Sequence, residues 1–168
     1  MNRPFAKNGG SAMKILVVYA TRSGTCKMVA ERVGKEMNAD VEQLADLVNR
    51  KGIFGFMLSG FQATAKRCSP LGPLTHDPAD YDLTIVVSPI WAGTYASPIR
   101  TFLRDYGKKM KEAAFLVLHM APKDQYLHVR NAFEAEYGKK VKAFDSLCVK
   151  DGPERLQTEV DLFLRNLV

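Results

Sequence analysis

Short apolar runs alternate along this chain with stretches in which apolar residues recur every three or four positions. The apolar runs predict five β-strands, at residues 14–20, 40–45, 83–88, 113–120 and 141–149. Three of them, 14–20, 83–88 and 113–120, are almost wholly apolar, which is typical of parallel strands buried on both faces. The run at 40–45 is weaker, and the run at 141–149 alternates poorly.

Four stretches between and after these runs have the period of amphipathic helices. Their apolar positions are Val29, Val33 and Met37; Ile99, Phe102, Leu103, Tyr106 and Met110; Tyr126, Val129, Phe133 and Tyr137; and Leu156, Val160, Phe163, Leu164 and Leu167. Ser97 and Pro98 predict a helix start, as an N-cap followed by proline at the first helical position. Gly138 predicts the C-cap of the third helix, and the last helix is expected to start near Pro153.

This alternation of strands and helices predicts an α/β fold with an open, doubly wound parallel sheet. The length of 168 residues suits one domain, which we expect to span 13–168. Residues 1–12 are polar and glycine-rich, and they lack the apolar segment of a signal peptide. We therefore predict that they are a flexible leader or tag.

Residues 47–80 form an unusually long connection, so they are expected to be functional or to have structure of their own. The segment combines three glycines with several large apolar residues: Ile53, Phe54, Phe56, Met57, Leu58 and Phe61. The simpler expectation is a short helix with one face on the sheet. The functional alternative is a mobile lid over a planar ligand, or a patch that docks a partner.

The turn after the first strand predicts an anion site. Residues 21–26, with the sequence TRSGTC, join a buried strand directly to a helix. The first N–H groups of a helix lack partners within it, and the helix dipole adds positive charge there, so a phosphate is a common ligand. Because the turn has neither GK[ST] nor GxGxxG, it suits a single terminal monophosphate. The alternative is that its hydroxyls merely cap the helix.

A second loop, residues 88–98, follows the third strand at the same edge of the predicted sheet. It holds Trp91, the single tryptophan of the chain, close to Gly93 and Tyr95. An aromatic residue on a glycine-bearing loop indicates stacking on a flat ring system. Core packing would explain Trp91 alone, but it explains the whole loop less well.

Composition narrows the functional classes. The formal net charge is +6, and Arg3 and Lys7 supply two of those charges. No concentrated basic stripe with interleaved aromatics is present, so nucleic-acid binding is not expected. No run approaches the ~20 apolar residues of a membrane span. The histidines form no metal-ligand pattern, and His119, in the fourth strand, is expected to be a core residue with satisfied hydrogen bonds.

The three cysteines, Cys26, Cys68 and Cys148, are too widely separated for a metal or redox motif. They indicate free thiols in a reducing cytoplasm. Cys26 is expected to be a small buried filler. The alternative is a redox role, because a helix N-terminus can lower the pKa of a thiol.

Together the two loops resemble those of the flavodoxin-like FMN-binding proteins, of the short-chain type. Residues 21–26 are similar to the family's phosphate loop, T/S-x-T/S-G-x-T. Residues 88–103 are similar to its first flavin-flanking loop and the helix after it. The resemblance implies a five-stranded parallel sheet in the order 2-1-3-4-5, with non-covalent FMN at its carboxyl edge.

The resemblance also implies which residues bind the cofactor. The first loop would hold the phosphate, the second would place Trp91 or Tyr95 against a ring face, and the loop after the fourth strand would face the pyrimidine edge. The residues so implied are Thr21, Arg22, Ser23, Gly24, Thr25 and Cys26; Pro89, Ile90, Trp91, Ala92, Gly93, Thr94 and Tyr95; and Ala121, Pro122, Lys123 and Asp124. In the family, the peptide that corresponds to Ala92–Gly93 can turn toward the flavin on reduction. No catalytic residue and no metal ligand is implied.

Three features depart from the family pattern. Cys26 stands where the last threonine of the phosphate loop is usual. The loop after the fourth strand lacks the aromatic residue that commonly stacks on the outer flavin face, although Tyr126 is near. Dedicated electron carriers of the family are usually acidic, whereas this chain is basic.

Two functions therefore remain open. The first is electron transfer between a redox partner protein, or a small acceptor, and a bound flavin. The second is an NAD(P)H-dependent reductase that acts on quinones or similar acceptors. A monomer and a homodimer are each compatible with both functions. A phospho-receiver domain is disfavoured, because Ala20–Thr21 and Ser88–Pro89 stand where that class needs acidic residues.

Overall fold

The fold is built on a parallel sheet whose five strands follow the predicted order. In the computed structural model, which describes residues 13–48, 52–121 and 126–167, the strands run in the order β2-β1-β3-β5-β6. Their bounds are β1 Ile15–Tyr19, β2 Asp40–Gln43, β3 Leu83–Trp91, β5 Glu112–His119 and β6 Phe144–Cys148. Counted without β4, this is the order 2-1-3-4-5, so the predicted doubly wound α/β fold is confirmed.

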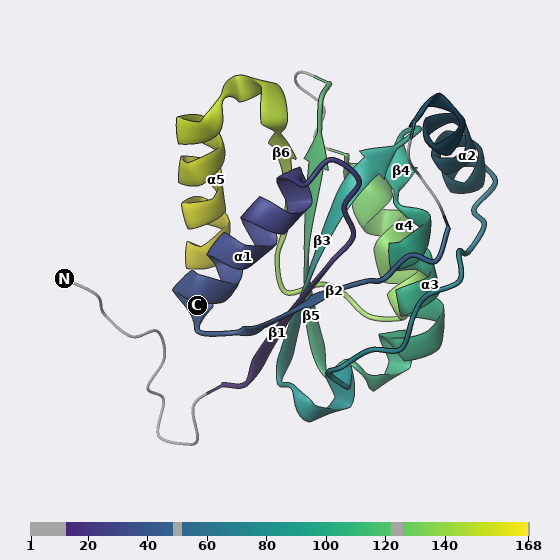
Figure 1. The fold of residues 1–168 in the computed structure, drawn as a ribbon. Helices are drawn as coiled ribbons and strands as arrows, with labels where there is room; N and C mark the ends of the chain where they lie inside the picture. Colours follow the sequence, from purple (N-terminus) through teal and green to yellow (C-terminus); the bar gives the residue numbers. More distant parts are fainter. Residues whose placement is uncertain (1–12, 49–51, 122–125, 168) are drawn as a thin grey trace.

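Helices cover both faces of the sheet (Figure 1). Their bounds are α1 Thr25–Met37, α2 Gly52–Thr64, α3 Ser97–Tyr106, α4 Leu127–Tyr137 and α5 Pro153–Arg165. Three short 3₁₀ turns lie between elements, at Pro78–Asp80, Gly107–Lys109 and Val149–Asp151. Among the described residues, no helix combines the length and apolarity that crossing a bilayer requires.

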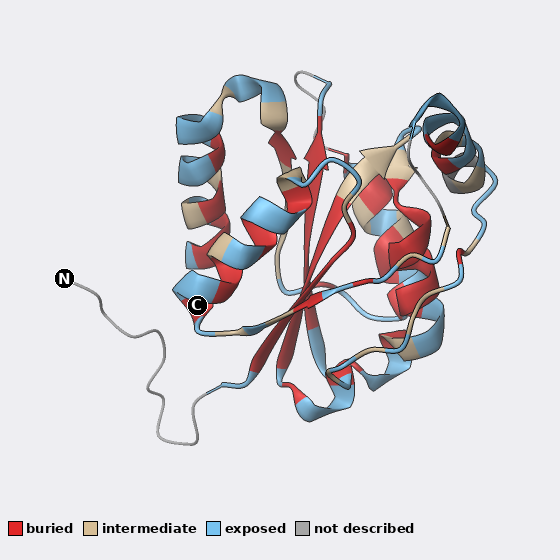
Figure 2. Ribbon diagram, viewed as in Figure 1, coloured by how far each residue is buried: buried red, intermediate tan, exposed pale blue. Residues whose placement is uncertain are grey.

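Alternate residues of each strand enter two separate cores. Val17, Ile85 and Leu116 pack with α1 and α5 on one face. Val18 and Val86 point to the other face, where they pack with α3 and α4. This is the two-residue period of a strand, here apolar on both sides because helices cover both sides. Figure 2 shows the central strands almost entirely buried.

Local signals placed most boundaries within one or two residues. Gly138 ends α4 in the left-handed conformation (φ 80°), as predicted. The predicted start of α3 was one residue late, because Ala96 is the cap and Ser97 is already helical. The third strand runs past Ser88 to Trp91 and then turns back as a short antiparallel strand, β4 Thr94–Tyr95. The sequence pattern did not predict this hairpin.

The segment 47–80 contains a helix, α2, and one face of it contacts β3, as the simpler expectation has it. The large apolar side chains of α2 are exposed, and Phe54 keeps 88% of its surface accessible. The side of α2 that faces the body carries the buried residues Gly55 and Ser59. The face of α2 that contacts the sheet is therefore made of small residues, and its large apolar side chains lie on the outward side.

Candidate functional site

A cavity of about 680 Å³ lies at the carboxyl edge of the sheet, which is where ligands of doubly wound sheets bind. Four segments and one further residue line it: Thr21, Arg22, Ser23, Thr25 and Cys26; Phe56, Met57, Ser59 and Gly60; Pro89, Ile90, Trp91, Ala92 and Gly93; Leu118, His119, Met120, Ala121 and Tyr126; and Val149. Among these residues Arg22 alone carries a permanent charge. The cavity is thus mostly apolar, with a cation and several hydroxyls at one end, as suits a ligand with an anionic tail.

The two predicted loops meet at this cavity. Most of the residues implied for the cofactor line it, including Ala121 from the third loop. Gly24, Thr94 and Tyr95 are not part of its lining. Pro122, Lys123 and Asp124 lie outside the described residues, as do residues 1–12.

The turn before α1 is open and rich in donors. Gly24 adopts a left-handed conformation (φ 91°) and its N–H donates to Thr21 Oγ1 over 2.9 Å. The hydroxyls of Ser23 and Thr25 lie 3.4 Å apart. Within the described chain no side chain caps this end of α1, and no atom lies within 4 Å of where a Cβ on Gly24 would stand. The alternative in which the hydroxyls cap the helix is therefore not what the structure shows.

Cys26 is a buried filler in the first turn of α1. Its exposed fraction is 3%, and burial raises the pKa of its thiol to about 12. The helix N-terminus favours the thiolate, but desolvation outweighs it here. The thiol is therefore neutral at physiological pH, which argues against the redox alternative.

The second loop is a tight hairpin turn at the rim of the cavity. Ile90 pairs with Tyr95 and Trp91 with Thr94, so Ala92 and Gly93 form a two-residue connection. Both have positive φ, 46° and 79°, which is the conformation of a type I′ turn. Glycine adopts it freely, whereas alanine is strained there by about 1–2 kcal/mol.

Two side chains hold this turn in place. Ser88 Oγ accepts a hydrogen bond from the Ala96 N–H over 3.1 Å and closes the base of the hairpin. His128 Nε2 lies 2.8 Å from the Gly93 carbonyl oxygen, to which the ring N–H donates. Sequence reasoning gave His128 no role, and no local signal could have found one, because the contact spans 35 residues.

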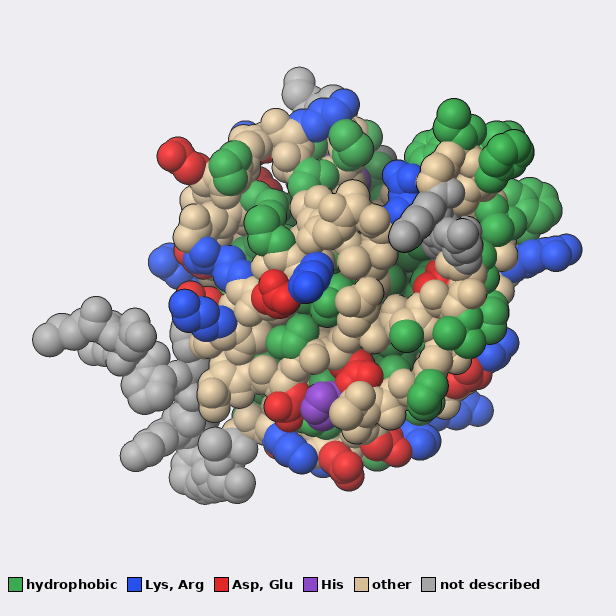
Figure 3. Space-filling view, viewed as in Figure 1, with side chains coloured by type: hydrophobic (Ala, Val, Ile, Leu, Met, Phe, Trp, Pro, Cys, Tyr) green, Lys and Arg blue, Asp and Glu red, His purple; other side chains and the backbone are tan. Residues whose placement is uncertain are grey.

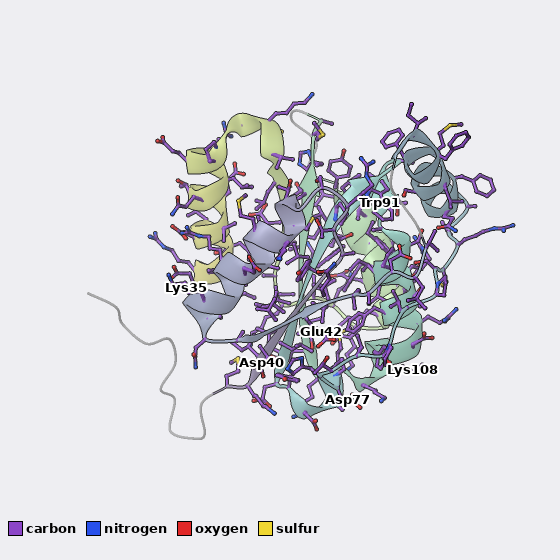
Figure 4. The ribbon with its side chains drawn as sticks, viewed as in Figure 1. Lys35, Asp40, Glu42, Asp77, Trp91 and Lys108 are labelled. Carbon is purple, nitrogen blue, oxygen red and sulfur yellow. The ribbon has the colours of Figure 1, made fainter. Side chains whose placement is uncertain are left out.

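Of the two aromatic residues implied for the ring face, Trp91 lines the cavity and Tyr95 does not. Trp91 is half-buried at the edge of the sheet that α2 borders (Figure 4). Tyr95 is fully buried, edge-on to Phe115 and Phe133, and the Arg100 guanidinium lies 4.5 Å from its ring. Burial raises the pKa of its hydroxyl. The alternation of the strand explains this result, because it points Tyr95 into the core.

His119 is buried, but its hydrogen bonds are not satisfied. Its exposed fraction is 4%, and neither ring nitrogen has a partner within the described part of the chain. The expectation of a satisfied core histidine is therefore wrong. Leaving a buried donor unpaired costs about 1–3 kcal/mol, so a ligand that pairs with it recovers that loss. The Tyr126 ring lies 4.6 Å from the imidazole, and both residues line the cavity.

Tyr126 supplies an aromatic ring near the loop after β5, where the sequence lacks the usual aromatic residue. It is the residue before α4, with φ 47°, and its side chain is nearly buried against the cavity. An aromatic ring therefore reaches the cavity from the segment after β5, although the loop itself carries none at the usual position.

Solved structures share this architecture. A flavoprotein from Lactobacillus acidophilus NCFM, crystallised in complex with FMN, aligns with a TM-score of 0.67 at 20% identity, over 91% of this chain and 99% of that chain. A flavodoxin from the domain Archaea aligns with a TM-score of 0.53 at 16% identity, over 92% and 96%.

The chain has a flavodoxin-like fold. An NADPH-quinone reductase from P. pentosaceus shares it, with a TM-score of 0.58 at 9% identity over 93% of this chain and 98% of that chain. No family model and no curated protein matches the sequence. The similarity to flavodoxin-like structures therefore lies in the fold, and the assignment of a ligand depends on the cavity.

The cavity fits a flavin mononucleotide in three respects. An uncapped helix start offers N–H groups and hydroxyls to a phosphate, and nothing fills the space beside Gly24. Trp91 and Tyr126 offer aromatic surfaces, and His119 offers buried, unpaired nitrogens. None of the described residues that line the cavity is a carboxylate that would repel an anion.

Proposed function

We propose that this protein binds FMN non-covalently in the cavity and transfers electrons through it. The observation that carries the proposal is that two segments far apart in the sequence line one cavity at the carboxyl edge of the sheet: residues 21–26, apart from Gly24, and residues 89–93. The complex of the Lactobacillus acidophilus flavoprotein with FMN, in the same fold, supports it.

The turn before α1 would hold the phosphate. The N–H groups at the start of α1, with the hydroxyls of Ser23 and Thr25, are the donors that the structure leaves available there. Arg22 adds a positive charge at the same end of the cavity. The thiol of Cys26 would contribute little beyond shape, since it is buried and neutral.

The remaining lining would hold the ring system. Trp91 and Tyr126 would contact its faces, and His119 would exchange a hydrogen bond with a polar edge. The turn at Ala92–Gly93 would lie beside the ring, where His128 fixes the Gly93 carbonyl. When bound, FMN supplies chemistry in one- or two-electron steps, and these residues bind it, orient it and exclude water.

A comparison of FMN with riboflavin tests the proposal. Flavin-free protein should quench the fluorescence of added FMN and turn yellow, and riboflavin, which lacks the phosphate, should bind at least tenfold more weakly. The double variant Ser23→Ala/Thr25→Ala should weaken FMN binding more than about a hundredfold, since each of the two hydrogen bonds to a charged group contributes about 1.5–3 kcal/mol. It should leave riboflavin binding unchanged, whereas Trp91→Ala should weaken both.

Lys108→Glu is a suitable control, because Lys108 is exposed and far from the cavity (Figure 4). A protein that stays colourless with excess FMN would contradict the proposal. Equal affinity for FMN and riboflavin would contradict the assignment of the phosphate to the turn before α1.

A second candidate function is an NAD(P)H-dependent reductase that acts on quinones. The apolar wall formed by Phe56 and Met57 favours it, since a planar apolar acceptor could contact that wall. The fold shared with an NADPH-quinone reductase is consistent with it. Steady oxidation of NADH or NADPH by the FMN-loaded protein with a quinone would establish the reductase, and its absence would leave electron transfer between proteins.

The cellular location follows from thiol chemistry. All three cysteines are free, and two of them are buried. Proteins that keep free cysteines are typical of a reducing cytoplasm. We therefore place the proposed electron transfer there, with a redox protein or a small acceptor as partner.

A further inference from the structure

The outward side of α2 carries a ridge of large apolar side chains. The α2 ridge consists of Ile53, Phe54, Phe56, Met57, Leu58 and Phe61, with exposed fractions of 77, 88, 61, 63, 38 and 58%. Half of the large apolar side chains that the described residues expose lie on this one helix. Figure 3 shows a protruding cluster of hydrophobic side chains over α2, at the upper right of the view. A contiguous apolar patch of this kind marks an interaction surface.

The exposure of the ridge is built into the fold. Ser59 is 2% exposed and donates to the Gly55 carbonyl over 2.7 Å, so the small residues of α2 face the body. A Cβ on Gly60 would stand 4.0 Å from that of Ala92, so this side of the helix lies next to the hairpin. The phenylalanines of α2 lie on other sides of the helix and stay exposed.

The charged residues in the chain on either side of α2 are all positive. Residues 47–76 contain no aspartate or glutamate but four cations, Arg50, Lys51, Lys66 and Arg67. Lys66 and Arg67 are exposed just after α2, and the Arg67 guanidinium lies 5.7 Å from the Phe61 ring. The helix itself carries no charged residue. The surface is thus an uncharged apolar helix flanked by cations.

An apolar ridge flanked by cations favours some binding partners over others. In a symmetric dimer the same patch faces itself, so each basic segment would lie against an identical basic segment. An anionic phospholipid surface instead offers an apolar interior for the ridge and negative charge for the flanking cations. A convex, phenylalanine-rich helix also suits a deformable layer better than a matching pocket.

We propose that the α2 ridge docks this protein reversibly on anionic phospholipid bilayers, with α2 lying in the interface. The apolar side chains enter the boundary between headgroups and acyl chains, and Lys66 and Arg67 contact phosphates. Because Phe56 and Met57 also line the cavity, docking brings the cavity opening to the membrane surface. The inference does not depend on the identity of the cofactor.

Co-sedimentation with vesicles tests the proposal. The full chain should pellet with phosphatidylcholine vesicles that contain phosphatidylglycerol, and remain in solution with phosphatidylcholine alone. High salt should release most of the bound protein, since the attraction is screened. The double variant Phe54→Ser/Phe61→Ser should lower the partition coefficient at least tenfold, because two exposed apolar anchors are lost.

Charge reversal and a matched control separate the two contributions. Lys66→Glu/Arg67→Glu should reduce binding more than tenfold, at about fivefold for each cation removed. The control Leu162→Ser/Lys108→Glu removes one exposed apolar residue and one exposed cation from other surfaces, and should bind as the parent does. Circular dichroism and thermal melting of each variant should match the parent, because all six positions are exposed.

Two outcomes would overturn the proposal. One is a parent protein that does not bind phosphatidylglycerol vesicles at low salt, or a control that loses binding as much as the ridge variants do. The other is a dimer in sedimentation equilibrium that Phe54→Ser/Phe61→Ser converts to a monomer while vesicle binding is unaffected. That result would make a second copy of this chain the occupant of the ridge.

Discussion

Helices α1 and α2 each have 13 residues, and both border the cavity. They differ in which side faces the body of the protein, because α1 turns its large apolar residues inward and α2 turns them outward. The inward side of α1 carries Val29, Val33 and Met37, which pack on the sheet. The inward side of α2 carries Gly55 and Ser59, and its large apolar residues face outward. An apolar stripe therefore packs α1 on the protein, whereas small residues form the contact side of α2.

The difference teaches that apolar periodicity predicts a helix more safely than it predicts the direction of its apolar face. The usual rule that the apolar side faces the core holds for α1, α3 and α5. It fails for α2, whose main contacts among the described residues are with β3, β4 and α3. This exception is the basis for the proposal that the α2 ridge is an interaction surface.

The largest expected effect comes from a matched pair of methionines. Met37→Ala in α1 should lower the free energy of unfolding by about 2–5 kcal/mol, because Met37 is only 9% exposed and its loss leaves a cavity. Met57→Ala in α2 should change it by less than about 0.5 kcal/mol, because Met57 is 63% exposed. Urea denaturation of the flavin-free protein measures both, and equal losses would break the comparison.

A second prediction concerns thiol reactivity at the two helices. With Cys68 and Cys148 replaced by serine, native Cys26 should react with iodoacetamide at pH 8 about a hundredfold more slowly than the free amino acid, since its thiol is buried and its pKa is about 12. Phe54→Cys in the same background should react at the ordinary rate. Rapid alkylation of Cys26 without unfolding would show that the first turn of α1 opens.

The smallest effect comes from a pair of glycines. Gly34→Ala in α1 should destabilise the protein by about 1–2 kcal/mol, because the new Cβ would clash with Val41 Cγ2. Gly60→Ala in α2 should stabilise it by about 0.5–1 kcal/mol, because its Cβ would meet Ala92 at an ordinary 4.0 Å and alanine favours the helix. Thermal melting should move in opposite directions, and a shift of the same sign in both variants would refute the packing difference.

Much of the fold was predictable because its signals are local or periodic. The buried strands were recognised from apolar runs, and Gly138 from its position after a helix. The hairpin at Ala92–Gly93 was missed because its short strand, β4, has only two residues, too few for a pattern. Its anchor, His128, contacts Gly93 across the fold, and sequence periodicity carries no information about such contacts.

The candidate site was predictable in its loops but not in its details. The loops 21–26 and 88–98 were expected at one edge, and residues of both line the cavity. The sequence did not show whether Trp91 or Tyr95 lines the cavity. That depends on the register of the hairpin, which points Tyr95 into the core. The lack of hydrogen-bond partners at His119 was also not predictable, because the sequence of an apolar strand does not show which groups pack against its histidine.

By itself the sequence determined the parallel sheet, its helices and the glycine-bearing turn before α1. These follow from short-range physics, namely the alternation of apolar residues, glycine at positive φ and the unpaired N–H groups of a helix start. Only the tertiary structure decided that α2 faces outward, that Tyr95 is core and that His119 has no partner. Those outcomes depend on which surfaces remain uncovered once the sheet and its helices have packed, and that is a property of the whole chain.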